Sequence, residues 1–282
     1  MKSENEIIQC ENFDFNLISR IPNQKRGRGN PKTKLKKHYK DIICAFDIET
    51  TNDLNMMQAY MYVWQFQIGD KTVIGRTWDQ FLEFLERIKE QLGENEYLVI
   101  FDHNLSFEFQ FLSGIYDFTS EEVFAIDSRK VLKCTMMNCF EFRCSYLHSN
   151  MSLSMYLDKM GVAHQKEKNY DYDKLRYPWT ELTDQELLYC INDVRGLVEA
   201  VQIEMTHDHD TLYTFPLTST GYVRRDAKRA MKYVSHTFIR DQLPDFEIYT
   251  LCREAFRGGN THANRMYAGY ILHDVQSADR SS

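Results

Sequence analysis

The stretch Asp41-Ile42-Ile43-Cys44-Ala45-Phe46-Asp47-Ile48-Glu49-Thr50-Thr51 leads from an apolar run into two carboxylates. The five residues before Asp47 are all apolar, which is typical of a central strand covered on both faces. Because side chains alternate along a strand, Asp47 and Glu49 point to the same face. Two carboxylates placed in this way repel each other and lose solvation, and a divalent cation between them is the usual compensation. The alternative is a solvated strand end that leads into a loop.

Length and composition describe a globular protein. The chain has 282 residues, of which 43% are hydrophobic, so it can bury the core of one large or two modest domains. The net charge of −7 argues against a protein that binds nucleic acid over its whole surface through positive charge. Seven cysteines without a C-x-x-C pair or a signal peptide indicate a reducing compartment and argue against structural zinc. No apolar run approaches the ~20 residues that span a bilayer, so we expect a cytoplasmic protein without a membrane partner.

Positive charge is concentrated before the quoted stretch. Nine Lys or Arg residues lie between Arg20 and Lys40 with no acid among them, and prolines and glycines interrupt the segment. This composition predicts a basic N-terminal arm or linker over residues 1–40. Contact with phosphate groups is one use for such an arm, and a solubilising tail is the other.

The hydrophobic pattern predicts an α/β domain over residues 41–205. A strand at 41–49 is followed by a hairpin within 60–75 and by a helix at 81–92. A short strand at 97–101 precedes another helix, strands follow within 123–148, and a helix begins near Ser152. Strands followed by mixed helices and strands favour one domain around a mixed central sheet.

The last helix of this domain has a clear start. Thr183 and Glu186 form a capping box. One stripe of the helix is apolar and is predicted to be buried; it consists of Leu187, Ile191, Val194, Val198 and Val201. Tyr189 and Asp193 are four residues apart and share a face roughly opposite that stripe. This face is either a solvent face or a functional one.

Four acids from separate segments then become candidates for one site. They are Asp47 and Glu49 on a strand, Glu108 on a helix and Asp193 on another helix. Two divalent ions about 4 Å apart that clamp a phosphodiester need about four acidic ligands. Tyr189, one turn before Asp193, is placed to hold the attacking water.

Three segments resemble the exonuclease motifs of family-B DNA polymerases of the DEDDy class. They are F-D-I-E-T at 46–50, H-N-L-S-F-E at 103–108 and Y-C-I-N-D at 189–193. The second is similar to the form found in protein-primed polymerases of phages and linear plasmids. The resemblance implies an RNase H-like 3′-5′ exonuclease domain. Glu108 stands where Asp is commoner, and its longer side chain implies a shifted metal ion and lower activity.

The resemblance also implies residue roles. Asp47, Glu49, Glu108 and Asp193 would bind two Mg²⁺ or Mn²⁺ ions, and Tyr189 would orient the attacking water. The family's catalytic lysine corresponds to Lys166 or Lys168, because one residue of slippage decides between them. The positions that match the family's contacts to single-stranded DNA are Asn104, Leu105, Phe107, Ser152, Leu153 and Tyr172.

Residues 206–282 resemble a connecting segment, mainly helical, and the start of a polymerase palm. A-F-R-G-G-N-T-H-A-N-R at 255–265 is similar to the Y-x-G-G segment that contacts the template strand, which assigns DNA contacts to Phe256, Arg257, Gly258 and Gly259. Asp279-Arg280-Ser281-Ser282 resembles the opening of the motif D-x-x-S-x-Y-P, in which Asp279 would bind a polymerase metal ion. We therefore expect the N-terminal part of a longer polymerase, which ends within this motif and does not itself incorporate nucleotides.

The resemblance implies a monomeric member of the DNA-directed DNA polymerases that proofreads during DNA replication. Its partners would be single-stranded DNA, primer-template DNA and a terminal protein primer, in the cytoplasm of a bacterial host of a phage or mobile element. Two alternatives remain open. A DEDD-type ribonuclease would share the ion site, and a catalytically weak or inactive remnant would bind single strands without cleaving them.

Overall fold

The computed structural model describes residues 7–25, 37–53, 58–127, 129–167, 170–171 and 173–255, and residues 267, 269 and 273. The chain divides into two units, Met1–Asp226 and Ala227–Ser282. None of the helices in these ranges combines the length and the apolar character that a membrane crossing requires.

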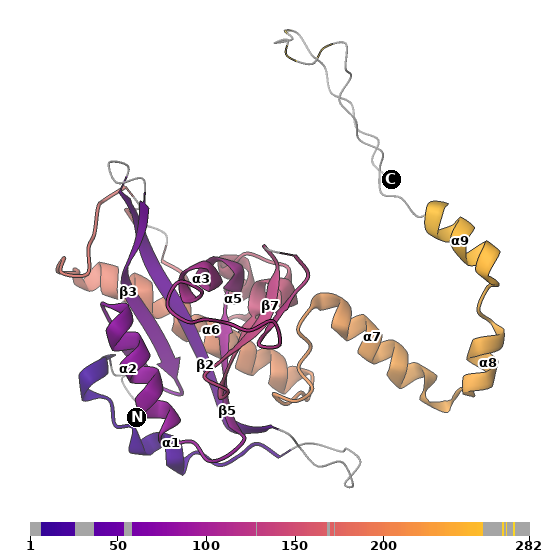
Figure 1. The fold of residues 1–282 in the computed structure, drawn as a ribbon, viewed down its shortest axis with the longest axis horizontal. Coiled ribbons are helices and arrows are strands. Elements are labelled where there is room, and N and C mark those ends of the chain that lie inside the picture. The colour runs from indigo at the N-terminus through magenta and orange to yellow at the C-terminus, as the bar shows by residue number, and fades with distance from the viewer. Residues whose placement is uncertain are drawn as a thin grey trace. The chain divides into compact units, whose positions relative to one another are not determined.

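A single mixed sheet forms the centre of the first unit (Figure 1). Its strands in chain order are β1 (Ile7–Gln9), β2 (His38–Asp53), β3 (Gln58–Ile68), β4 (Lys71–Gly75), β5 (Glu96–Asp102), β6 (Val123–Ala125), β7 (Val131–Met136) and β8 (Phe140–Cys144). The order across the sheet is β1-β4-β3-β2-β5-β8-β7-β6. β2 is parallel to β5 and antiparallel to β3, so the strand predicted from the quoted stretch lies inside the sheet.

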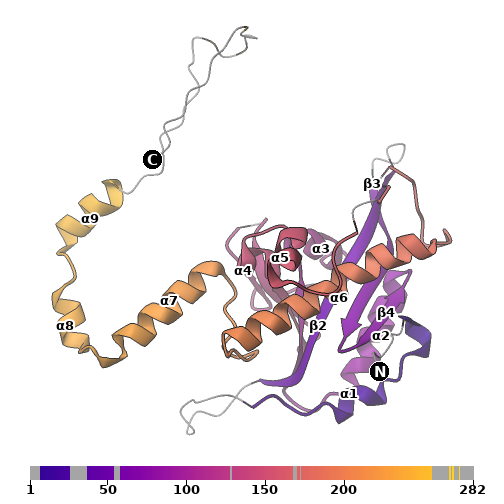
Figure 2. The same ribbon diagram turned by 180° about the vertical axis from the view of Figure 1, so that it is seen from behind.

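Helices cover both faces of this sheet. The helices of the first unit are α1 (Asn16–Arg20), α2 (Trp78–Lys89), α3 (Leu105–Leu112), α4 (Ser145–Ser149), α5 (Leu153–Met160) and α6 (Asp184–His207), with a 3-10 turn η1 (Cys10–Asn12). α2 and α3 lie on one face, and α6 crosses the other (Figures 1 and 2). The predicted mixed α/β architecture is therefore confirmed.

The pattern of β2 explains its central place. Cys44 and Phe46 point into the core that α2 and α3 cover, whereas Ile43 and Ala45 point into the core that α6 covers. Ala45 lies opposite Phe101 of β5, and Asp47 lies opposite Gln65 of β3. Apolar side chains therefore fix the position of β2 in the sheet as far as Phe46. The first of the two carboxylates, Asp47, follows directly after Phe46.

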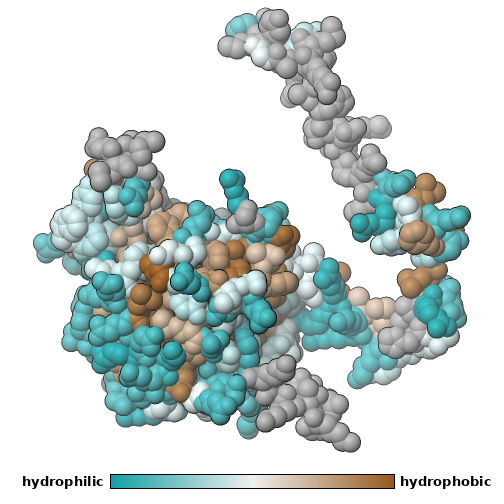
Figure 3. All heavy atoms as spheres, viewed as in Figure 1, coloured by the Kyte–Doolittle hydropathy of each residue, from teal (hydrophilic) through white to brown (hydrophobic). Residues whose placement is uncertain are grey.

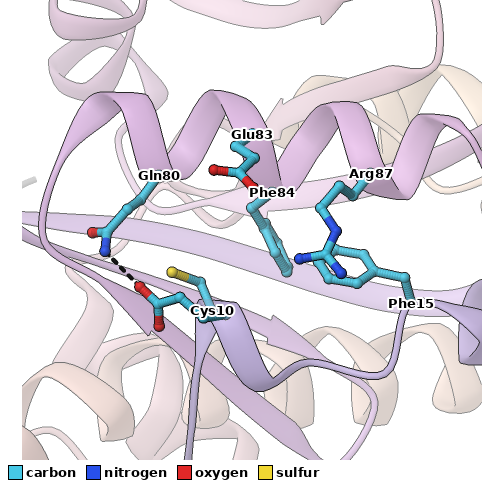
Figure 4. A pocket seen from close by; sticks show the side chains of 7 residues that line it. Cys10, Phe15, Gln80, Glu83, Phe84 and Arg87 are labelled. Carbon is cyan, nitrogen blue, oxygen red and sulfur yellow. Dashed lines mark hydrogen bonds between the residues drawn. The ribbon is translucent and has the colours of Figure 1, made fainter.

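The N-terminal residues correct the expectation that 1–40 forms an arm. β1 pairs in parallel with β4, and Phe13, Phe15 and Ile18 are buried. Figure 4 shows Phe15 against α2, where the Arg87 guanidinium carbon lies 3.9 Å from the ring centroid. Residues 7–18 contain no Lys or Arg, and most of their apolar side chains pack into the core, so the domain includes 7–25. The most basic part of the predicted arm, at 26–36, lies outside the described residues.

The described part of the chain after α6, up to residue 255, is mainly helical, as predicted. Its elements are α7 (Ser219–Ala230), the 3-10 turn η2 (Met231–Tyr233), α8 (His236–Asp241) and α9 (Phe246–Ala255). α7 spans the boundary between the two units. The predicted start of a polymerase palm lies outside the described residues.

Gly196 of α6 packs closely against α5 and the segment that follows it, and a substitution at this glycine tests the fold. A Cβ atom at Gly196 would lie 2.4 Å from the His164 carbonyl oxygen and 2.8 Å from Leu157 Cδ1. We expect Gly196→Ala to lower the free energy of unfolding by about 1–3 kcal/mol, because overpacking outweighs the better helix propensity of alanine. Urea unfolding measures this, with Ser154→Ala at an exposed position of α5 as the control. An unchanged midpoint for Gly196→Ala would contradict this packing.

Candidate metal centre

Three of the four predicted acids converge where α6 crosses β2. Asp47, Glu49 and Asp193 each offer a carboxylate oxygen, and these atoms all lie within 4.8 Å of one another. Asp193 is buried, whereas Asp47 and Glu49 are partly exposed. Solvent therefore reaches the two strand residues of the cluster.

The protein partly compensates this negative charge. Burial and the neighbouring Asp193 raise the pKa of Asp47 to about 7, although Lys166 and a hydrogen bond from Gln65 act against the shift. Gln65 Nε2 donates to Asp47 Oδ2 at 2.7 Å. Burial and the carboxylates of Asp47 and Asp193 hold the pKa of Glu49 well above its ordinary value. The cluster therefore favours either protons or a cation near neutral pH.

Lys166 is the lysine that the structure brings to this cluster. Its ammonium group forms an ion pair with the Asp193 carboxylate and lies 4.9 Å from the centroid of the Tyr189 ring. Burial lowers the pKa of Lys166, but Asp193, Asp47 and Glu49 together raise it above its ordinary value. The other candidate, Lys168, lies outside the described residues.

Tyr189 is part of a buried aromatic cluster. It is 3% exposed, so this face of α6 is not a solvent face. Its ring stacks on Tyr170, with centroids 4.0 Å apart and planes 26° apart. The Tyr170 hydroxyl is hydrogen-bonded to that of Tyr62 on β3, and the Arg176 guanidinium carbon lies 4.6 Å from the Tyr170 ring centroid. Tyr170 thus holds Tyr189 in place, whereas the predicted Tyr172 lies outside the described residues.

Glu108 lies on α3 but outside the three-residue cluster. It is 3% exposed. Burial raises its pKa well above the ordinary value, and Asp102 and Asp47 raise it further. The fourth predicted ligand is therefore close enough for the Asp47 carboxylate to raise its pKa, but it lies outside the three-residue cluster.

Asp102, the last residue of β5, is an acid that the sequence did not single out. Its side chain is fully buried beside that of Glu108, and the two acids interact directly: a hydrogen bond between them lowers the pKa of Asp102 and raises that of Glu108. Burial raises its pKa well above the ordinary value. The only signal in the sequence was a carboxylate at the end of an apolar strand, the same signal that identified Asp47.

The residues predicted to contact single-stranded DNA fall into different environments. Asn104 is exposed and adopts a left-handed conformation with φ of 88° before α3, and Phe107 is 38% exposed. Ser152 is exposed and caps α5, with Leu153 partly buried beside it. Leu105 is fully buried, because the helix turns its side chain into the core, and its predicted DNA contact stays a prediction.

His103 joins two of these segments, which the sequence did not reveal. Its Nδ1 lies 2.9 Å from Ser145 Oγ, and its Nε2 lies 3.1 Å from the carbonyl oxygen of Met151, next to Ser152. Burial lowers the pKa of His103 to about 4, so the ring is neutral at physiological pH. A neutral ring has one N–H, so the ring is the donor in only one of these two contacts. His103 therefore fixes the loop before α3 to the start of α5.

The predicted sites in the C-terminal region cannot be placed. Phe256, Arg257, Gly258, Gly259 and Asp279 all lie outside the described residues.

Comparison with known proteins identifies the fold. No family model and no curated protein sequence matches the chain. A structure of phi29 DNA polymerase complexed with single-stranded DNA matches with a TM-score of 0.62 and 12% identity, covering 80% of this chain and 41% of the polymerase. The same polymerase complexed with primer-template DNA matches with a TM-score of 0.61 and 14% identity over the same shares. The chain thus spans about two fifths of the length of these polymerases, and the likeness shows a shared fold.

The raised pKa of Asp47 gives a prediction for stability. Because this pKa rises from 3.8 to about 7 on folding, the folded state favours protonated Asp47. The resulting stability is fully present below pH 4 and is lost as the pH rises through 7. Without divalent cations we expect the free energy of unfolding to fall by up to about 4 kcal/mol over this range.

Denaturant unfolding at several pH values, with a chelator, measures this loss. Asp47→Asn should flatten the dependence, and Mn²⁺ at pH 8 should restore stability to the parent protein. Asp158→Asn, at an exposed position of α5, should leave the dependence as it is. A parent protein whose stability rises steadily between pH 4 and 8 without cations would contradict the assignment.

Proposed function

We propose that the first unit is a metal-dependent 3′-5′ exonuclease acting on single-stranded DNA ends, in a chain related to protein-primed family-B DNA polymerases. The observation that carries this proposal is the convergence of Asp47, Glu49 and Asp193 within 4.8 Å. These acids belong to motifs in the order that the polymerase family uses. The shared fold with phi29 DNA polymerase supports the same conclusion.

The donor set fits hard divalent cations. The cluster offers only carboxylate oxygens, which suit Mg²⁺ and Mn²⁺ rather than softer metals. Raised pKa values at Asp47 and Glu49 indicate that the folded protein needs positive charge to keep both acids ionised. When bound, two such ions would lower the pKa of a water molecule and neutralise the charge of the leaving oxygen.

The residues around the cluster would position the strand and the phosphate. Lys166 holds a positive charge beside Asp193, where it can steady the scissile phosphate. Phe107 is partly exposed next to Glu108 and can stack on a terminal base. Asn104 and Ser152 are exposed close to His103 and can contact the sugar and phosphate groups. Such contacts do not depend on base identity, as the removal of misinserted nucleotides requires.

The position of Glu108 favours a second candidate function. This residue lies outside the three-residue cluster and has Asp102 as a buried acidic neighbour. If Glu108 does not turn toward Asp47, the site lacks its fourth ligand. The unit would then bind single strands without cleaving them.

A 5′-labelled single-stranded oligonucleotide incubated with Mg²⁺ or Mn²⁺ separates these functions. The exonuclease predicts stepwise shortening from the 3′ end, which a chelator abolishes. Asp47→Ala and Asp193→Ala should each lower the rate about 10²- to 10⁴-fold, because each removes a ligand for ions that contribute several kcal/mol.

Asp158→Asn is the matched control and should retain the parent rate. Equal activity in the parent and in Asp47→Ala would refute the assignment. Binding of the strand without metal-dependent cleavage would support the second candidate, and faster cleavage of RNA than of DNA would support a ribonuclease.

A further inference from the structure

A groove of about 470 Å³ lies on the sheet face that carries α2 and α3. Its walls are the first residues of β3, the start of α2, the end of α3 and Pro178. Figure 3 shows this face of the first unit, where apolar side chains interrupt the hydrophilic surface. The groove is separate from the three-carboxylate cluster, which faces α6.

Aromatic rings connect the groove to Phe107, which precedes Glu108 on α3. Tyr60, Trp78 and Phe111 line the groove. The Phe111 and Trp78 rings are stacked, with centroids 6.4 Å apart and planes 28° apart. One helical turn earlier, Phe107 contacts Phe111 at 5.4 Å. A row of rings therefore runs from the neighbour of Glu108 into the groove.

Arg76 gives the groove a positive charge. Its Nε donates to the carbonyl oxygen of Tyr62 at 2.7 Å, and its Nη2 donates to the carbonyl oxygens of Tyr177 and Thr180 at 3.0 and 2.7 Å. These partners are neutral. No carboxylate of the described residues forms an ion pair with Arg76, so its charge remains available to an anion in the groove.

We propose that this groove is a second subsite for single-stranded DNA, which holds nucleotides that precede the terminal nucleotide at the metal centre. Bases would stack on Trp78 and Tyr60, and a phosphate would lie near Arg76. Stacking on aromatic rings beside a cation is the general means of holding single strands without reading their sequence. The continuous row of rings from Phe107 indicates that the occupant is the same strand whose end is cleaved. The proposal thus rests on the exonuclease function proposed above.

Binding as a function of strand length tests the subsite without relying on cleavage. The probes are fluorescein-labelled oligothymidylates of two and eight nucleotides, and fluorescence anisotropy with a chelator present gives their affinities. The subsite predicts that the longer strand binds more tightly to the parent protein. Trp78→Ala should weaken binding of the longer strand about fivefold or more, because it removes one stacking partner, and should leave binding of the dinucleotide unchanged.

Three further variants keep the test independent of folding. Trp78→Phe retains a ring and should restore the affinity for the longer strand to within about twofold of the parent. Phe124→Ala removes an exposed ring from β6, at the opposite edge of the sheet, and should have no effect. Arg76→Gln should reduce the slope of log affinity against log salt by about 0.7, as expected for one lost phosphate contact.

The outcomes distinguish the two proposals. Equal effects of Trp78→Ala on both strand lengths, or no effect on the longer strand, would overturn the subsite even if the protein cleaves DNA. Loss of affinity that depends on Trp78 in a protein that never cleaves DNA would support the subsite and reject the exonuclease.

Discussion

The packing of α6 across β2 brings three carboxylates into a space where three negative charges are unstable without compensation. Asp47 and Glu49 must face α6 because the strand alternates and its apolar residues fix the register. Asp193 must face β2 because apolar neighbours bury this part of α6. Lys166 provides one positive charge against the three acids. Every other feature of the site either supports this convergence or compensates its charge.

Segments far apart in the chain hold the convergence in place. The segment that carries Lys166 is fixed to α6, because the Ala163 amide donates to Glu199 at 2.8 Å and Gly196 allows the His164 carbonyl to approach the helix. Tyr170 and Tyr62 hold the Tyr189 ring one turn before Asp193. These packing contacts therefore hold the like charges together against their mutual repulsion.

The sequence predicts the parts of this arrangement that local periodicity determines. The quoted stretch predicts a central strand with two acids on one face, and the capping box at Thr183 marks the start of α6 one residue later. The motifs group four acids, of which the structure gathers Asp47, Glu49 and Asp193 and leaves Glu108 outside the cluster. Burial of Tyr189 does not follow from its own helix, because the Tyr170 ring that covers it lies on a separate segment.

Three features escaped prediction for physical reasons. β1 has three residues, which is too short for strand alternation to be recognised, and its burial depends on pairing with β4. Asp102 ends an apolar strand, and its burial depends on the pairing of that strand with β8, where Asp102 lies opposite Cys144. Leu105 matches a motif for DNA contact, but the direction of α3 turns its side chain into the core. Each depends on a neighbour that is distant in sequence or on the direction of a helix.

The central claim is that Asp47, Glu49 and Asp193 together bind divalent cations. Anomalous diffraction from crystals soaked in Mn²⁺ tests it most directly. The account predicts a manganese peak among these three side chains, with carboxylate oxygens at about 2.0–2.6 Å, and no such peak in Asp193→Ala crystals. Soaked crystals without a peak among the three carboxylates, or with the same peak in Asp193→Ala, would contradict it.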